Sequence, residues 1–121
     1  MSYKTWKAEY YTKAADLVSK EDALAHSIQK WKGLSKAALK RHGLRAGSGV
    51  IYSGNEEVGI VSAQTCALCV HYLHQATNCW RCPLSIANKG MACDDQYNTF
   101  VWNDDNRPML RLLRKAQNML R

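Results

Sequence analysis

Residues 66–93 read CALCVHYLHQATNCWRCPLSIANKGMAC and contain all five cysteines of the chain. Cys66 and Cys69 are separated by two residues, and so are Cys79 and Cys82. Two thiolates at this spacing bind one metal ion from a single tight turn, and two such turns complete a tetrahedral four-sulfur site, for which zinc is the usual occupant. The spacing therefore predicts a zinc site. Four thiolates leave zinc no open position for water or substrate, so the predicted metal is structural.

Three further residues of this stretch compete for the metal. Cys93 follows the second cysteine pair, and His71 and His74 are spaced to share one face of a helix. Each of the three is an alternative ligand, and the sequence leaves the choice open. Disulfides are the rival interpretation. An odd number of cysteines and a polar, basic beginning, MSYKTWK, favour reduced thiols in a cytoplasmic protein.

Composition predicts one soluble domain. The chain has 121 residues, of which 46% are hydrophobic, and a chain of this size buries about two-thirds of its unfolded surface in one core. No apolar run reaches the roughly 18 residues that a membrane-spanning helix needs. We therefore expect no membrane partner, and the sequence leaves homo-oligomerisation open.

Positive charge is concentrated at both ends of the chain, which has a formal net charge of +7. Residues 1–47 carry ten Lys or Arg against four acidic residues, and residues 106–121 carry five against none. Residues 48–105, which include the cysteines, carry two against six. Phosphate binding relies on Lys and Arg at the contact. A polyanion is therefore expected to bind the terminal segments rather than the cysteine-rich part.

Hydrophobic spacing predicts helices in the amino-terminal part. Apolar residues recur every three or four positions in two runs, first Trp6, Tyr10, Ala14 and Leu17, and then Leu24, Ile28 and Trp31. Ser19 followed by Asp22 resembles a helix start, so residues 4–32 form either one long helix or two. The aromatic residues of these runs are expected in the core.

Two further helices are predicted from capping signals. Ser35 can cap a short helix over Lys36–His42, which Gly43 would end in a left-handed conformation that costs glycine little. Near the carboxyl end, Asp105 or Asn106 can cap a helix that has Pro108 in its first turn. Its expected apolar stripe consists of Met109, Leu112, Leu113, Ala116 and Leu120.

A small β-hairpin is expected between the helices. Residues 50–52 are β-prone, residues 53–55 form a turn signal, and residues 58–61 can return as a second strand. The predicted fold is α+β and mostly helical, a single domain over residues 1–121. Its expected parts are a basic helical part at 1–47, a hairpin at 48–65, a zinc-stapled cysteine insert at 66–105 and a basic helix at 106–121.

The cysteine frame resembles that of a group of small bacteriophage-encoded proteins with a C-x2-C…C-x2-C-P-L…C pattern. The resemblance rests on Ser27–Leu34, His42–Leu44, Cys66–Cys69, Cys79–Leu84 and the trailing Cys93, and it covers about residues 27–102. The functions of that group are mostly uncharacterised. The resemblance implies a phage origin, a place in the host cytoplasm and a metal site, and by association an anti-defence role against a host protein or nucleotide signal.

Catalytic signatures are sparse. The sequence contains no phosphate-binding glycine loop, no H-E-x-x-H and no G-x-S-x-G. Adjacent acids such as Glu56-Glu57, Asp94-Asp95 and Asp104-Asp105 point apart on a strand and diverge on a helix, so we interpret them as solvated turns or caps. The protein is expected not to be an enzyme. A small zinc-dependent nuclease or hydrolase is the third-ranked alternative.

The leading hypothesis is a binding protein for a nucleic acid or a phosphorylated small molecule. Its expected ligand-binding residues are basic, with one tryptophan that can stack on a base: Lys36, Lys40, Arg41, Arg45, Trp80, Arg81, Arg111 and Arg114. The alternative is a protein–protein inhibitor of a host enzyme, with Trp80 and Arg81 as the anchor between two thiolate ligands.

The cysteine spacing makes a direct prediction about metal content. Protein purified without added zinc should contain about one zinc per chain by native mass spectrometry. Cys66→Ser or Cys82→Ser should lose the metal and stability together, because structural zinc contributes on the order of 10 kcal/mol to folding. Two disulfides without stoichiometric metal, or a serine variant with an unchanged melting temperature, would contradict the site.

Overall fold

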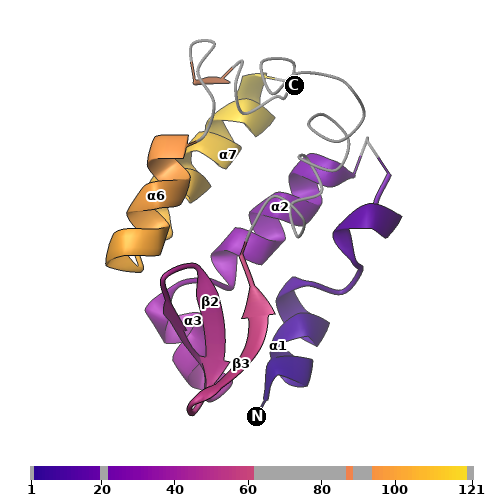
Figure 1. The fold of residues 1–121 in the computed structure, drawn as a ribbon. Helices are drawn as coiled ribbons and strands as arrows, with labels where there is room; N and C mark the ends of the chain where they lie inside the picture. Colours follow the sequence, from indigo (N-terminus) through magenta and orange to yellow (C-terminus); the bar gives the residue numbers. More distant parts are fainter. Residues whose placement is uncertain (1, 20–21, 62–86, 89–93, 120–121) are drawn as a thin grey trace.

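A computed structural model describes residues 2–19, 22–61, 87–88 and 94–119 (Figure 1). The helices are α1 (Tyr3–Tyr10), the 3-10 turn η1 (Ala15–Leu17), α2 (Ala23–Lys32), α3 (Lys36–Arg41), α6 (Asp94–Asn103) and α7 (Arg107–Met119). The strands are β1 (Arg45–Gly47), β2 (Val50–Ser53) and β3 (Glu56–Ile60). The described part is therefore mostly helical with one small antiparallel sheet, which confirms the α+β class.

Helix α2 lies in the middle of the structure, with α1 on one side and α6 and α7 on the other (Figure 1). Its apolar residues Leu24, Ile28 and Trp31 are all buried, as the spacing predicts. The stripe of α7 also meets the core, since Met109, Leu112, Leu113 and Ala116 are buried. Leu120 lies outside the described residues. Among the described residues, none of the helices has the length and apolar character required to cross a bilayer.

The carboxyl-terminal end of α2 is tied to both neighbours by buried hydrogen bonds. The last carbonyls of a helix have no partner inside the helix. Trp6 Nε1 donates to the Gly33 carbonyl at 2.7 Å, and Asn106 Nδ2 donates to the Trp31 carbonyl at 2.8 Å. These two bonds join α1 and the segment before α7 to the same end of α2.

Residues 4–32 form two α-helices, α1 and α2, rather than one long helix, and the 3-10 turn η1 lies between them. Helix α1 ends at Tyr10 because Tyr11 leaves the helical conformation, so the helical spacing no longer applies beyond it. The predicted continuation of the stripe is therefore wrong: Ala14 and Leu17 are exposed, and Ala15 and Val18 are buried in their place. The side chain of Asp22, next to α2, accepts from the Ser19 hydroxyl at 3.1 Å.

Helix α3 begins and ends as its caps predict. The Ser35 hydroxyl accepts from Ala38 N at 3.1 Å, and Gly43 has φ of +73°. The amide of Gly43 donates to Lys40 O, and that of Leu44 donates to Leu39 O, which is the hydrogen-bond pattern of a Schellman motif. The chain then turns directly into β1.

The sheet has one strand more than expected. Strands β2 and β3 form the predicted hairpin, and β1 pairs with β2 in antiparallel register, Arg45 opposite Tyr52. Residues 48 and 49 therefore form a second hairpin turn. Ser48 and Gly49 both have positive φ, at 52° and 79°, as in the primed turns that fit the twist of paired strands.

Helix α6 was not expected from the sequence. It lies within residues 66–105, which were assigned to the cysteine insert, and all five cysteines themselves lie outside the described residues. Phe100 of α6 is fully buried, with its ring 5.1 Å from that of Trp31 in an edge-to-face arrangement. Tyr97 donates to the Val61 carbonyl at 2.5 Å. These contacts fix α6 to both the helical core and the sheet.

Gly33 leaves no room for a side chain. A Cβ atom there would lie 2.4 Å from Tyr10 Cγ, so Gly33→Ala should lower the free energy of unfolding by about 1–3 kcal/mol, the usual cost of overpacking. Chemical denaturation measures the change. Gly47→Ala is the control, since its Cβ would meet Tyr52 at 3.7 Å, an ordinary contact. Equal stability of the two variants would contradict the packing.

Candidate phosphate-binding site

A hollow of about 300 Å³ opens where α3, β1 and the turn between α6 and α7 meet. Its lining combines apolar and charged residues, namely Leu34, Lys36, Leu39, Lys40, Leu44, Arg45, Ala46 and Asp104. Three of the residues expected to bind phosphate, Lys36, Lys40 and Arg45, are therefore brought together. They come from two adjacent elements, and Asp104 comes from a third that is distant in sequence.

Local structure explains the convergence of the three cations. Lys36 and Lys40 are four residues apart on α3 and so share one face of the helix. The turn at Gly43 then reverses the chain, and Arg45 begins β1. Helix α3 packs against β1. The same local signals that predict α3 therefore place all three side chains around one hollow.

The three cations are exposed and have no acidic partner among the described residues. The ion pairs in that part of the chain are Glu9 with Arg41 and His42, and Asp105 with Arg107. Among the described residues, Asp104 is the one carboxylate that lines the hollow. Three positive charges against one negative charge make the hollow attractive to an anion.

Arg45 is held in place by an aromatic neighbour. Its guanidinium carbon lies 4.3 Å from the centre of the Tyr52 ring, which is opposite it in the β1–β2 register. A guanidinium over an aromatic face is favoured electrostatically and keeps its hydrogen-bond donors free for a ligand. The floor beneath the cations is apolar, because Leu34, Leu39 and Leu44 are buried.

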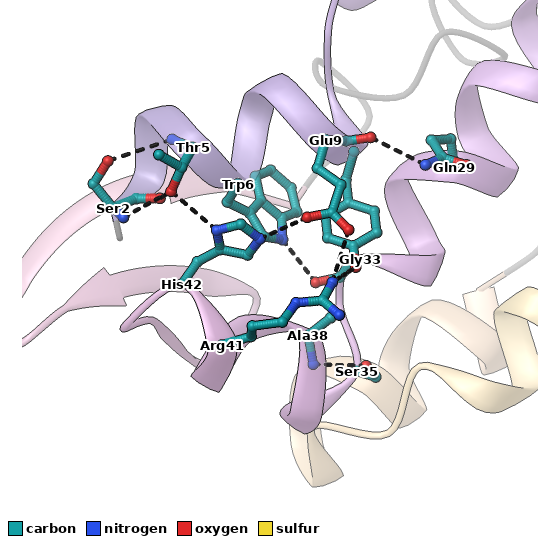
Figure 2. Close-up of polar contacts among 11 residues, drawn as sticks. Ser2, Thr5, Trp6, Glu9, Gln29, Gly33, Ser35, Ala38, Arg41 and His42 are labelled. Carbon is teal, nitrogen blue, oxygen red and sulfur yellow. Dashed lines mark hydrogen bonds and ion pairs between the residues drawn. The ribbon is translucent and has the colours of Figure 1, made fainter.

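Arg41, also expected to bind phosphate, belongs to a different contact on the face of α3 toward α1 (Figure 2). Its guanidinium lies 2.8 Å from Glu9 Oε1 and donates a hydrogen bond to the Tyr10 hydroxyl. His42 Nε2 lies 2.9 Å from the other Glu9 oxygen, and His42 Nδ1 lies 2.9 Å from Thr5 Oγ1 (Figure 2). This network connects α1 to α3. Because Glu9 pairs with Arg41, the charge of Arg41 is largely neutralised and contributes less to binding an anion.

The network changes the acidity of two of its members. Hydrogen bonding from His42, then from Tyr10, and the charge of Arg41 hold the pKa of Glu9 below its ordinary value of 4.5. Burial raises the pKa of Tyr10, and its contact with Glu9 adds to the rise. Both groups therefore keep their usual forms at neutral pH, an ionised carboxylate and a neutral phenol.

The other predicted ligand residues do not reach the hollow or lie outside the described part. Arg111 and Arg114 are exposed on α7 and do not line the hollow. Trp80, Arg81, His71 and His74 lie outside the described residues, as do the cysteines. Within the described ranges, no three His, Cys, Asp or Glu side chains are grouped to hold a metal ion.

Sequence reasoning missed the part played by Asp104, although it anticipated that of its neighbour Asp105. Asp105 behaves as the expected cap: it accepts from Arg107 N at 3.0 Å, and its bonds with Arg107 lower its pKa to about 2. Asp104, in contrast, has a φ of +57° and lines the hollow. Nothing in the local sequence separates these two neighbours.

No protein-family model, curated protein or solved structure matches this chain.

The Glu9 network predicts a pH dependence of stability. A carboxyl whose folded-state pKa lies below its unfolded value stabilises the fold above the unfolded value and loses that contribution as the pH falls through the folded value. Glu9→Gln should therefore lower the melting temperature at neutral pH and flatten its decline below about pH 4.5. Thermal unfolding followed across this range measures both effects.

Glu57→Gln is the matched control, because Glu57 is exposed on β3 and has no ion pair within the described residues. It should retain the wild-type pH profile. Identical profiles for Glu9→Gln and the wild type would show that the network does not contribute to stability.

Proposed function

We propose that this chain is a non-enzymatic binding protein whose ligand carries phosphate, as a nucleic acid or a nucleotide does, and that the phosphate binds in the hollow lined by Lys36, Lys40 and Arg45. One observation carries the proposal. Three exposed cations line one hollow and lack acidic partners in the described part of the chain. Unpaired cations around a concave surface are what a phosphate requires, since counterion release and direct pairing supply most of its binding energy.

The three side chains have different tasks in this proposal. Arg45, oriented by Tyr52, presents the planar fork of donors that matches two phosphate oxygens. Lys36 and Lys40 act as flexible point charges that follow the phosphate. The leucines of the floor accept the less polar parts of the ligand, a sugar or a ring, and give the hollow a preference beyond charge.

The zinc site stays a prediction from the cysteine spacing and enters the proposal as a structural support. A four-thiolate zinc has no open coordination position, so it does not contact the ligand. The ligand site and the metal site are separate hypotheses, and each can fail without the other.

Neutralising the hollow tests the proposal. The triple variant Lys36→Gln, Lys40→Gln, Arg45→Gln should bind single- and double-stranded DNA more weakly. The magnitude of the slope of log affinity against log salt should fall by about 2–3, since each lost phosphate contact contributes about 0.9 on a duplex and about 0.7 on a single strand. Fluorescence anisotropy at several salt concentrations measures both quantities.

The control removes the same charge elsewhere. Arg111→Gln, Arg114→Gln, Lys115→Gln changes three exposed cations of α7 and should keep most of the affinity and slope. An equal loss in both triple variants would show that binding depends on total charge and not on the hollow. Wild-type affinity in the first variant would refute the site.

A further inference from the structure

Trp102 differs from the other described tryptophans. Trp6 and Trp31 are buried, at 2% and 3% exposure, whereas the side chain of Trp102 is 80% exposed on α6. The other aromatic residues of α6 are used inside the protein, Phe100 against Trp31 and Tyr97 on the Val61 carbonyl. Trp102 makes no ring contact with any described residue. The indole is therefore open to a partner from outside the chain.

The chain places the backbone of Trp102 near the phosphate-binding hollow, although Trp102 itself does not line it. Trp102 precedes Asp104 by two residues, and Asp104 lines the hollow. Two trans peptide links span at most about 7.6 Å between Cα atoms. A ligand that extends out of the hollow past Asp104 therefore passes near Trp102.

A second hollow extends the first on this side. It measures about 310 Å³, shares Lys36 and Asp104 with the first, and is lined in addition by Asn103, Asp105, Asn106 and Arg107. Its two carboxylates balance its two cations, and Arg107 is already paired with Asp105 at 2.9 Å. This hollow suits an uncharged polar group, unlike its neighbour with three cations.

We infer that the ligand is a single-stranded nucleic acid that extends beyond the two hollows, with a phosphate at Lys36, Lys40 and Arg45 and an unpaired base stacked on the exposed ring of Trp102. The inference rests on the proposed function and specifies its ligand. Single strands bind to proteins through cations along the backbone and aromatic rings under the bases. A duplex keeps its bases stacked inside and offers no face to an indole.

Asp104 separates the phosphate from the base in this arrangement. Its carboxylate lines both hollows and repels a phosphate from the Trp102 side. The amide of Asn103 can pair with donors or acceptors on a base edge. The phosphate and the base are thereby separated along the two hollows.

The test compares three polyanions on the full chain: a single-stranded oligothymidylate of about ten nucleotides, a duplex of equal length and inorganic polyphosphate. Trp102→Ala should weaken single-strand binding about tenfold, within the range for one lost stacking contact, and leave polyphosphate binding within about twofold. Trp102→Phe should restore most of the loss, because a phenyl ring still stacks. Circular dichroism should show unchanged folding, since the side chain is mostly exposed.

Leu17→Ala is the control, since Leu17 is 65% exposed on η1 and should bind all three polyanions like the wild type. If Trp102→Ala binds the single strand like the wild type, or loses polyphosphate binding equally, the stacking inference is wrong while the proposed function stands. If the wild type binds none of the three polyanions, the proposed function fails and the inference fails with it.

Discussion

The carboxyl-terminal end of α2 is the point on which the described fold depends. The carbonyls of Gly33 and Trp31 accept hydrogen bonds from Trp6 of α1 and from Asn106 before α7. Both bonds are buried, where an unmade bond costs about 1–3 kcal/mol. Gly33 permits this arrangement because its missing Cβ leaves space for the Tyr10 ring. Three helices that are far apart in sequence are thus held at one place.

The same anchor builds the candidate site. Directly after Gly33 the chain passes through Leu34 into α3, which carries Lys36 and Lys40, so one wall of the hollow begins at the end of α2. Asn106 fixes the turn between α6 and α7 to Trp31, and this turn carries Asp104 to the opposite wall. The hydrogen bonds to the carbonyls at the end of α2 thus position both α3 and the turn before α7. For this reason Lys36 and Asp104 line the same hollow.

Charge pairing divides the basic residues into structural and available groups. Glu9 engages Arg41 and His42, and Asp105 engages Arg107, so these side chains stabilise local structure. Lys36, Lys40 and Arg45 have no such partner in the described part of the chain and remain available to a ligand. A count of basic residues does not separate the two groups, because Glu9, which pairs with Arg41 of α3, comes from α1.

The sequence by itself determined the elements that depend on local signals. The stripe of α2, the cap at Ser35, the left-handed turn at Gly43 and the hairpin at residues 50–60 arise from contacts within a few residues, so spacing and capping predict them. Tertiary structure alone decided the end of α1, the pairing of β1, the helix α6 and the meeting of Asp104 with Lys36. These features depend on contacts between segments that are distant in sequence, and local sequence patterns do not predict such contacts. Three of the predicted ligand residues line one hollow because they lie close together on the continuous segment from α3 to β1, whereas Asp104 joins them only through the packing of α6 and α7.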